Sequence, residues 1–182
     1  MKKRTVALLS GGISSEREVS LNSGNQVFEA LDKEKYRVIR YDPKTDLPRL
    51  VAEADDIDVA LVILHGPFGE DGTIQGLFEM IGLPFVGCDA ASSAVCMDKI
   101  FCKSLLDQAG LQTPPWQVID RASWTEHRER LIGLSLGLGL PLFVKPARLG
   151  SSVGISKVVD RGELAPAVAQ ALALGPHDPI TH

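Results

Sequence analysis

The sequence predicts an α/β fold with a parallel sheet and crossover helices in an amino-terminal domain, followed by the first part of a second domain. Short apolar runs alternate with helical patterns along the first half of the chain, which is typical of parallel strands joined by crossover helices. Further along, two strand-like runs flank a loop of small residues, which indicates an antiparallel hairpin instead. With 182 residues, 45% of them hydrophobic, the chain is long enough to bury a core.

Four apolar runs are the expected strands of the first domain. They are Thr5–Leu9, Tyr36–Tyr41, Val59–Leu64 and the short Pro84–Val86. A helix is expected to begin at Ser15, because Ser15 and Glu18 have the S-x-x-E spacing of a capping box and apolar residues then recur at helical spacing. Two further helices are expected at Thr73–Ile81 and Ala90–Ala109, the second one broken near Met97–Asp98.

A pair of prolines marks a change of domain. The segment Gly110–Trp116 contains Pro114 and Pro115, which force extended chain and interrupt the helical pattern. We place the domain boundary ahead of this segment, near residue 97. The two predicted domains are therefore residues 1–97 and residues 98–182.

The second domain is expected to contain the hairpin, two helices and one more strand. In chain order the elements are a strand at Trp116–Ile119, a helix from Ser123 to about Ile132, the antiparallel hairpin strands Leu142–Lys145 and Ile155–Val159, and a helix at Gly162–Leu174. Pro166 is tolerable in the last helix only if it lies in the first turn. Residues 175–182 contain two prolines and no periodicity, so we interpret them as a tail.

Composition excludes several classes of partner. The balance of 19 Lys and Arg against 23 Asp and Glu gives a net charge of -4 without a basic block, which argues against a nucleic acid partner. No apolar run reaches the roughly 18 residues of a membrane helix. The cysteines Cys88, Cys96 and Cys102 are odd in number and lack C-x-x-C spacing, so they predict neither a disulfide framework nor a metal site. We expect a cytoplasmic protein that binds neither nucleic acid nor membrane.

The first candidate site residues follow the first strand. Gly11 and Gly12 allow a tight turn and close approach of a ligand, and the start of the next helix favours an anion. The third glycine of a dinucleotide fingerprint is absent, so a purely structural turn stays open. Glu16, expected in the first turn of the helix, can hold a substrate ammonium group, or it merely complements the helix dipole by roughly 0.3 to 1 kcal/mol.

The loop His65–Gly72 follows an apolar strand and therefore also lies at the carboxyl end of a strand, where ligands of such folds bind. His65 can position a substrate, or it is an ordinary hydrogen-bonded loop histidine. Glu70 and Asp71 lie side by side in the chain, and adjacent residues seldom point at one target. We interpret these two acids as solvated charges.

Lys145 ends an apolar strand of the hairpin, so its ammonium group must either reach solvent or meet an anion. The loop after it supplies backbone amides and hydroxyls without bulky side chains, and consists of Gly150, Ser151, Ser152, Val153 and Gly154. This favours phosphate, with a plain hairpin turn as the alternative. It is not a Walker-type loop, because the lysine precedes the glycines. Lys99 is a candidate second cation for the same phosphates, or else a solvated helix charge.

Four segments in this order closely resemble bacterial D-alanine–D-alanine ligases. They are Ser10–Ser20, His65–Gly66 with Gly69–Gly76, Met97–Lys99, and Val144–Pro146 with Gly150–Gly154. The similarity spans residues 4 to about 172. It implies a Rossmann-like, pre-ATP-grasp amino-terminal domain followed by the first part of an ATP-grasp domain. It also implies ATP and Mg²⁺ as cofactors, and ligation of two D-alanines through a D-alanyl phosphate for peptidoglycan synthesis, cell-wall biogenesis and cell shape.

The resemblance also implies roles for single residues. Glu16 is similar to the carboxylate that holds the ammonium of the first D-alanine, and Ser151 is similar to its hydrogen-bonding companion, so both are candidate catalytic residues. His65, Gly11 and Gly12 are the expected substrate-binding residues. The residues expected on the ATP phosphates are Lys99, Lys145, Ser152, Val153 and Gly154.

The end of the chain departs from the family. Family members continue with the segments that bind adenine and magnesium, whereas after Lys145 the only acids here are Asp160, Glu163 and Asp178, so we expect no metal ligands in this chain. We therefore expect a shortened polypeptide that is inactive alone. We also expect a homodimer. Three alternatives stay open: a non-catalytic fragment or interaction module, another nucleotide-binding protein such as a dinucleotide-dependent enzyme, and a D-alanine–D-lactate type of ligase.

Overall fold

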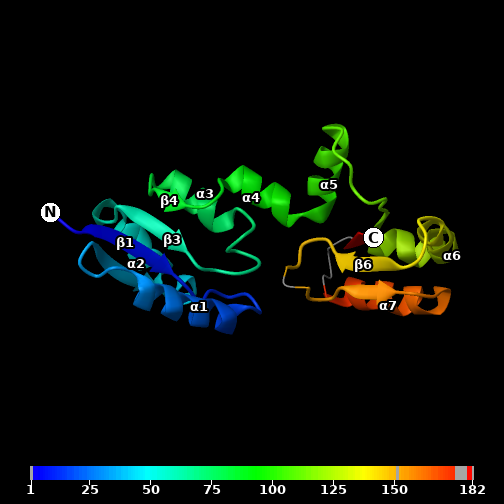
Figure 1. The fold of residues 1–182 in the computed structure, drawn as a ribbon, viewed down its shortest axis with the longest axis horizontal. Coiled ribbons are helices and arrows are strands. Elements are labelled where there is room, and N and C mark those ends of the chain that lie inside the picture. Colours follow the sequence, from blue (N-terminus) through cyan, green and yellow to red (C-terminus); the bar gives the residue numbers. More distant parts are fainter. Residues whose placement is uncertain (1, 151, 175–179, 182) are drawn as a thin grey trace. The chain divides into compact units, whose positions relative to one another are not determined.

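The structure is a computed structural model that describes residues 2–150, 152–174 and 180–181. The chain divides into two compact units, Met1–Val95 and Cys96–His182, and each is described by itself (Figure 1). The roles predicted for the two domains, a substrate-binding domain and an incomplete ATP-grasp domain, stay predictions.

The first unit is built on a four-stranded parallel sheet, which confirms the predicted α/β class. Its strands are β1 (Arg4–Leu9), β2 (Tyr36–Tyr41), β3 (Val59–Val62) and β4 (Phe85–Val86). The strand order is β2-β1-β3-β4, and every neighbouring pair is parallel. Because β1 is central, its residues from Val6 to Leu9 are all buried.

Helices cover both faces of this sheet. They are α1 (Arg17–Ala30), α2 (Pro43–Ala52) and α3 (Thr73–Met80). The 3-10 turn η1 (Ala54–Asp56) follows α2, and helix α4 (Ala90–Met97) crosses the boundary of the unit at Val95. Figure 1 shows α1 and α3 on opposite sides of the sheet. Leu50 of α2 and Phe78 of α3 share one core cluster with Ala7 and Leu9 of β1, so α2 and α3 pack on the same face. Alternate residues of a strand point to opposite faces, which leaves the other face to α1.

The second unit combines an antiparallel sheet with three helices. Its elements are α5 (Lys99–Gln108), β5 (Val118–Ile119), α6 (Arg121–Gly137), β6 (Leu142–Pro146), β7 (Ser156–Val158), α7 (Arg161–Leu174) and β8 (Ile180–Thr181). The strand order is β5-β8-β6-β7, and β6 and β7 form the predicted antiparallel pair. Val144 of β6 is buried in a core with Ile132 of α6 and Val168 of α7. Its neighbours Phe143 and Lys145 therefore point to the opposite face of the strand.

Some local predictions were wrong, and one helix was not predicted. Helix α1 begins at Arg17 with Glu16 as N-cap and no side-chain cap, so Ser15 and Glu18 do not form a capping box. The hydroxyl of Ser14 accepts the Glu16 N–H instead, at 3.2 Å. Glu16 consequently lies one residue before the first turn rather than in it.

The other differences concern prolines and the chain end. Pro166 lies in the second turn of α7, where its missing N–H leaves one helix carbonyl without its usual donor. Helix α2 was not predicted, because Pro43 and Pro48 both lie within its ten residues; Pro43 suits the first turn and Asp42 caps it. The interpretation of residues 175–182 as a tail is wrong at Ile180–Thr181, which form β8, while 175–179 and 182 lie outside the described residues.

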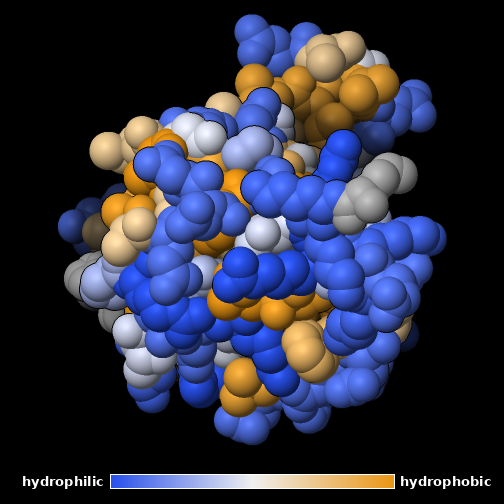
Figure 2. Space-filling model, turned by 90° about the vertical axis from the view of Figure 1, so that its left-hand side faces the viewer, coloured by the Kyte–Doolittle hydropathy of each residue, from blue (hydrophilic) through white to orange (hydrophobic). Residues whose placement is uncertain are grey.

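The described helices are all too short or too polar to cross a lipid bilayer. Figure 2 shows one face of the molecule, on which hydrophilic residues predominate and hydrophobic ones gather in small groups between them. Cys88, Cys96 and Cys102 all carry free thiols.

Candidate functional site

The sheet of the first unit has a topological switch point between β1 and β3. From β1 the chain goes first to β2 on one side and then returns to β3 on the other. In open α/β sheets, ligands bind at the carboxyl ends of the strands where the order reverses in this way. The loops after β1 and β3, which carry the predicted substrate residues, both begin at this position.

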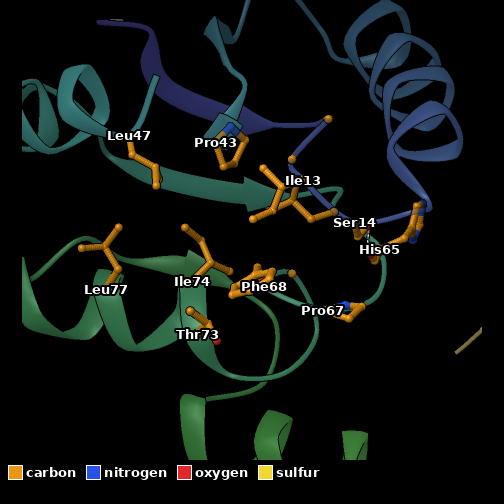
Figure 3. A pocket seen from close by; sticks show the side chains of 14 residues that line it. Ile13, Ser14, Pro43, Leu47, His65, Pro67, Phe68, Thr73, Ile74 and Leu77 are labelled. Carbon is orange, nitrogen blue, oxygen red and sulfur yellow. Dashed lines mark hydrogen bonds between the residues drawn. The ribbon is translucent and has the colours of Figure 1, made fainter. Parts of the chain in front are cut away.

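A cavity of about 160 Å³ lies between these two loops and helices α2 and α3. Figure 3 shows Ile13, Phe68 and Ile74 pointing toward one another across it. Apart from Ser14, His65 and Thr73, its lining is made of apolar side chains and glycines. The cavity can therefore receive a small apolar group, while polar recognition has to come from its edge.

The two glycines after β1 are required by the backbone. Gly11 and Gly12 have φ of 97° and 79°, and a Cβ on Gly11 would lie 2.7 Å from the carboxyl atoms of Asp42. Their N–H groups donate to the Ser20 hydroxyl (2.8 Å) and to Asp42 Oδ1 (2.9 Å). These amides thus hold the loop itself, and the predicted substrate-binding role of the two glycines stays a prediction.

An ion pair that the sequence did not reveal clamps this loop. Arg17 Nη2 lies 2.6 Å from Asp42 Oδ2, and Arg17 Nη1 donates to the Gly12 carbonyl at 2.7 Å. Burial raises the pKa of Asp42, but the hydrogen bonds from Arg17, Gly12 and Lys44 outweigh it and lower that pKa below its usual value. Arg17 and Asp42 are 25 residues apart, so no local pattern could have paired them.

Glu16 and the loop that begins at His65 lie next to each other. The Glu16 carboxylate approaches Gly66 so closely that a Cβ there would be 2.4 Å from Oε2. The Ser14 hydroxyl links the same loops by donating to the His65 carbonyl at 2.8 Å. His65 Nε2 lies 3.4 Å from the Ser23 hydroxyl. The structure therefore brings Glu16 and the His65–Gly66 backbone to one edge of the sheet.

Glu70 and Asp71 are not simply solvated. Glu70 accepts the Gly66 N–H at 2.7 Å, and Asp71 accepts the N–H groups of Phe68 and Thr73 at 2.8 and 3.1 Å. Both carboxylates shape the loop after β3. Within the described residues, no group of three or more His, Cys, Asp or Glu side chains could hold a metal ion.

A second cavity, of about 540 Å³, lies within the second unit and is lined by three lysines. Lys99 and Lys103 come from α5, and Lys145 comes from β6. The remaining lining is largely apolar and consists of Cys96, Cys102, Pro114, Pro115, Leu138, Gly139, Pro141, Leu142 and Phe143. A volume in this range suits a ligand of nucleotide size.

Lys99 is tied to the loop that follows β6. Its ammonium group donates to the carbonyls of Leu149 (2.7 Å) and Ala147 (3.3 Å). Burial lowers the pKa of Lys99, and the charge of Lys145 lowers it further. Next to it, the buried carboxylate of Asp98 caps α5 and pairs with Arg148 at 2.8 Å. Lys99 thus lines the cavity and also holds the residues that lead into the loop predicted to bind phosphate.

The loop itself is only partly described. Ser152 has a positive φ of 61°, and the N–H groups of Val153 and Ile155 donate back to Gly150 and Ser152 at 3.0 and 3.3 Å. Ser152, Val153 and Gly154 do not line the lysine cavity. Ser151 lies outside the described residues. Of the residues predicted to bind the ATP phosphates, the structure therefore brings together Lys99 and Lys145.

Lys103 was not predicted as a site residue. It follows Lys99 by four positions on α5, and residues at this spacing share one face of a helix. That spacing was visible in the sequence, but the phosphate site predicted there included only Lys99 and Lys145 as cations.

Comparison with known proteins assigns both units to one family. The family described as "D-ala D-ala ligase N-terminus" matches residues 5–46 and 41–88, and "D-ala D-ala ligase C-terminus" matches residues 105–177. A D-alanine--D-alanine ligase of Syntrophobacter fumaroxidans is 56% identical over 167 residues, which are 92% of this chain and 52% of that protein.

Solved structures of D-alanine--D-alanine ligases and of a related ligase also resemble this chain. A D-alanine--D-alanine ligase from Bacillus anthracis has a TM-score of 0.83 at 36% identity, covering 98% of this chain and 57% of that one. A D-alanine--D-alanine ligase from Bacillus anthracis complexed with ATP has a TM-score of 0.79 at 33% identity, covering 98% and 57%. VanG D-Ala:D-Ser ligase from Enterococcus faecalis has a TM-score of 0.77 at 32% identity, covering 99% and 62%.

The match therefore covers nearly all of this chain but only part of each relative. The chain spans about half the length of the curated relatives it matches, 52% and 55% for the first two of them. Both family matches, and the order in which they occur, agree with the resemblance seen in the sequence. The chain belongs to the D-alanine–D-alanine ligase family and corresponds to the amino-terminal part of these enzymes.

Proposed function

We propose that the protein acts in the ATP-dependent ligation of two D-alanines to D-alanyl-D-alanine, through a D-alanyl phosphate, for peptidoglycan synthesis. The observation that supports this most is that one chain carries two sites of the required chemistry. The first unit has a carboxylate at a sheet switch point, and the second has a cavity lined by lysines. Family membership supplies the substrates, D-alanine and ATP.

Glu16 is proposed to hold the ammonium group of the first D-alanine. Its carboxylate lies at the carboxyl edge of the sheet beside Gly66, and the Ser14 hydroxyl fixes its backbone N–H. A carboxylate there gives an ammonium a charge-assisted hydrogen bond. His65, Gly11 and Gly12 would form the rest of the substrate site, with Ser151 as the proposed companion of Glu16.

Lys99 and Lys145 are proposed to hold the phosphates of ATP, with Ser152, Val153 and Gly154 as covering residues. Both lysines line the cavity of the second unit, and neither forms a salt bridge within the described part of the chain. ATP supplies the phosphoryl group that makes a carboxylate reactive. The lysines neutralise charge and fix the phosphates, so their contribution is positioning and electrostatic.

Four finer statements stay predictions. Dependence on Mg²⁺ follows from the family alone, and we derive no step through it, because the described residues contain no cluster that fits a metal ion. The inactivity of the 182-residue chain alone is to be checked by phosphate release with ATP, magnesium and D-alanine. The predicted homodimer is to be checked by sedimentation equilibrium, and the cytoplasmic location by cell fractionation.

The substrate site is tested by D-alanine titration of the 182-residue chain, followed by NMR. Glu16→Gln should weaken D-alanine binding by about tenfold or more, the effect of losing one charged hydrogen bond. Glu18→Gln is the matched control, because Glu18 is an exposed acid of the same helix. Equal affinity in Glu16→Gln, Glu18→Gln and the unmodified chain would remove Glu16 from the site.

A further inference from the structure

We propose that Lys103 is a third phosphate-binding cation of the second unit, acting with Lys99 and Lys145 on the triphosphate of a nucleotide. The inference rests on the proposed function, because it adds a residue to the ATP site. No sequence motif points to Lys103; its placement in the fold does.

The three lysines line one cavity. Lys99 and Lys103 are one turn apart on α5, and Lys145 comes from the strand β6. All three side chains are half-buried. The rest of the lining, which includes Pro114, Pro115 and Phe143, is largely apolar, so the three lysines are the charged groups that line this cavity.

Among the residues that the structure describes, no carboxylate is bound to Lys103. Its ammonium donates to the Pro114 carbonyl at 3.1 Å and lies 5.7 Å from the ring centroid of Trp116. Asp107 raises its pKa only through charge, and the Asp107 carboxylate itself accepts from Thr113 Oγ1 and Trp116 Nε1 at 3.0 and 2.8 Å. Lys103 forms no salt bridge within the described part of the chain.

Repulsion between these cations favours an anion of high charge. Burial lowers the pKa of Lys103, and Lys145 lowers it further; Lys99 shows the same two effects. Half-buried like charges are costly unless a counter-charge enters. A polyphosphate brings several negative charges in one chain and fits a cavity of about 540 Å³. A phosphate monoester carries at most two negative charges, one fewer than these three cations supply.

The alternative is a structural role, in which Lys103 only holds Pro114 and packs on Trp116. The two roles differ in what they predict. A structural lysine affects all nucleotides equally and changes the protein without ligand. A phosphate-binding lysine affects binding in proportion to the number of phosphates and makes it dependent on salt.

The test measures the affinity of the 182-residue chain for AMP, ADP and ATP by isothermal titration calorimetry. Lys103→Ala should weaken ATP binding by about tenfold and AMP binding by less than about twofold. Lys103→Met keeps most of the apolar stem over Trp116 and should show the same loss, so a folding defect of the alanine variant does not decide the result. Lys103→Arg should retain most of the affinity.

Lys44→Ala is the matched control, because it removes one exposed positive charge from α2 of the first unit. If Lys103→Ala and Lys103→Met bind ATP as tightly as the Lys44→Ala control while Lys145→Ala does not, the inference is wrong and the proposed ATP site stands. An equal loss for AMP and ATP identifies a structural role and also overturns it. If the unmodified chain binds no nucleotide, the inference and the proposed ATP site of this chain both fail.

Discussion

The ion pair between Arg17 and Asp42 should stabilise the first unit measurably. The Asp42 carboxylate accepts from Arg17 Nη1 and Nη2 at 3.1 and 2.6 Å, and from the N–H groups of Gly12 and Lys44 at 2.9 and 3.0 Å. It is also the N-cap of α2. One side chain thus fixes the loop after β1 and the start of a helix, so its loss affects both.

Two substitutions separate these contributions. Asp42→Asn keeps an acceptor for the cap and removes the charge. With the side chains of Arg17 and Asp42 exposed by 30% and 21%, this pair lies between an exposed salt bridge and a buried charged hydrogen bond, so its loss should cost about 1 to 2 kcal/mol. Asp42→Ala also removes the cap, which adds about 1 kcal/mol. The free energy of unfolding should therefore fall by about 2 to 3 kcal/mol in Asp42→Ala.

The assay can follow each unit separately because of where the aromatic residues lie. Tyr36 and Tyr41, the only tyrosines, are in the first unit, and Trp116 and Trp124, the only tryptophans, are in the second. In urea titrations the tyrosine band in near-ultraviolet circular dichroism should move to lower urea in both Asp42 variants. Tryptophan fluorescence should not move. An unchanged tyrosine transition, or an equal shift of both probes, would refute the reasoning.

The sign of the pH dependence follows from the lowered pKa of Asp42. A carboxylate whose pKa is lower in the folded state stabilises the fold above its unfolded pKa, about 3.9 for Asp, and loses this effect as the pH falls through the folded pKa. The stability difference between the unmodified chain and Asp42→Asn should therefore be full at neutral pH and shrink below about pH 4. A difference that grows on acidification would contradict the assignment.

Two further substitutions test packing and capping. Gly24→Ala should destabilise the first unit by about 1 to 3 kcal/mol in the tyrosine assay, because the new Cβ would lie 2.4 Å from Ser10 Cβ. Gly133→Ala in α6, where nothing lies within 4 Å of the new Cβ, should instead stabilise the second unit by about 0.5 to 1 kcal/mol. A stabilising Gly24→Ala together with a destabilising Gly133→Ala would show that the close approach at Gly24 is absent. Asp98→Ala removes the cap of α5 and the ion pair with Arg148, so it should lower the free energy of unfolding measured by tryptophan fluorescence by about 2 kcal/mol. The control Glu126→Ala removes an exposed acid of α6 and should have little effect.

Much of the fold could be predicted from the sequence. The strand Tyr36–Tyr41 was predicted with its observed bounds, and the break of the helix near Met97–Asp98 is the junction between α4 and α5. These features depend on the order of apolar and polar residues within a short stretch, and such order is local. The family too could be seen from motif order alone, because each motif is a run of neighbouring residues.

The site was predicted less completely, for a physical reason. That Glu16 lies beside Gly66, that Arg17 pairs with Asp42, and that Lys103 shares a cavity with Lys145 are all contacts between residues far apart in the chain. Local pattern sets which residues form strands and helices, whereas the pairing of strands and the packing of helices on them decide which side chains meet. The sequence by itself therefore determined most of the elements, the candidate carboxylates, and the expectation that Lys99 and Lys145 share a phosphate site. The tertiary structure alone decided the contacts that no motif encodes, namely Glu16 beside Gly66, Arg17 with Asp42, and Lys103 in the lysine cavity.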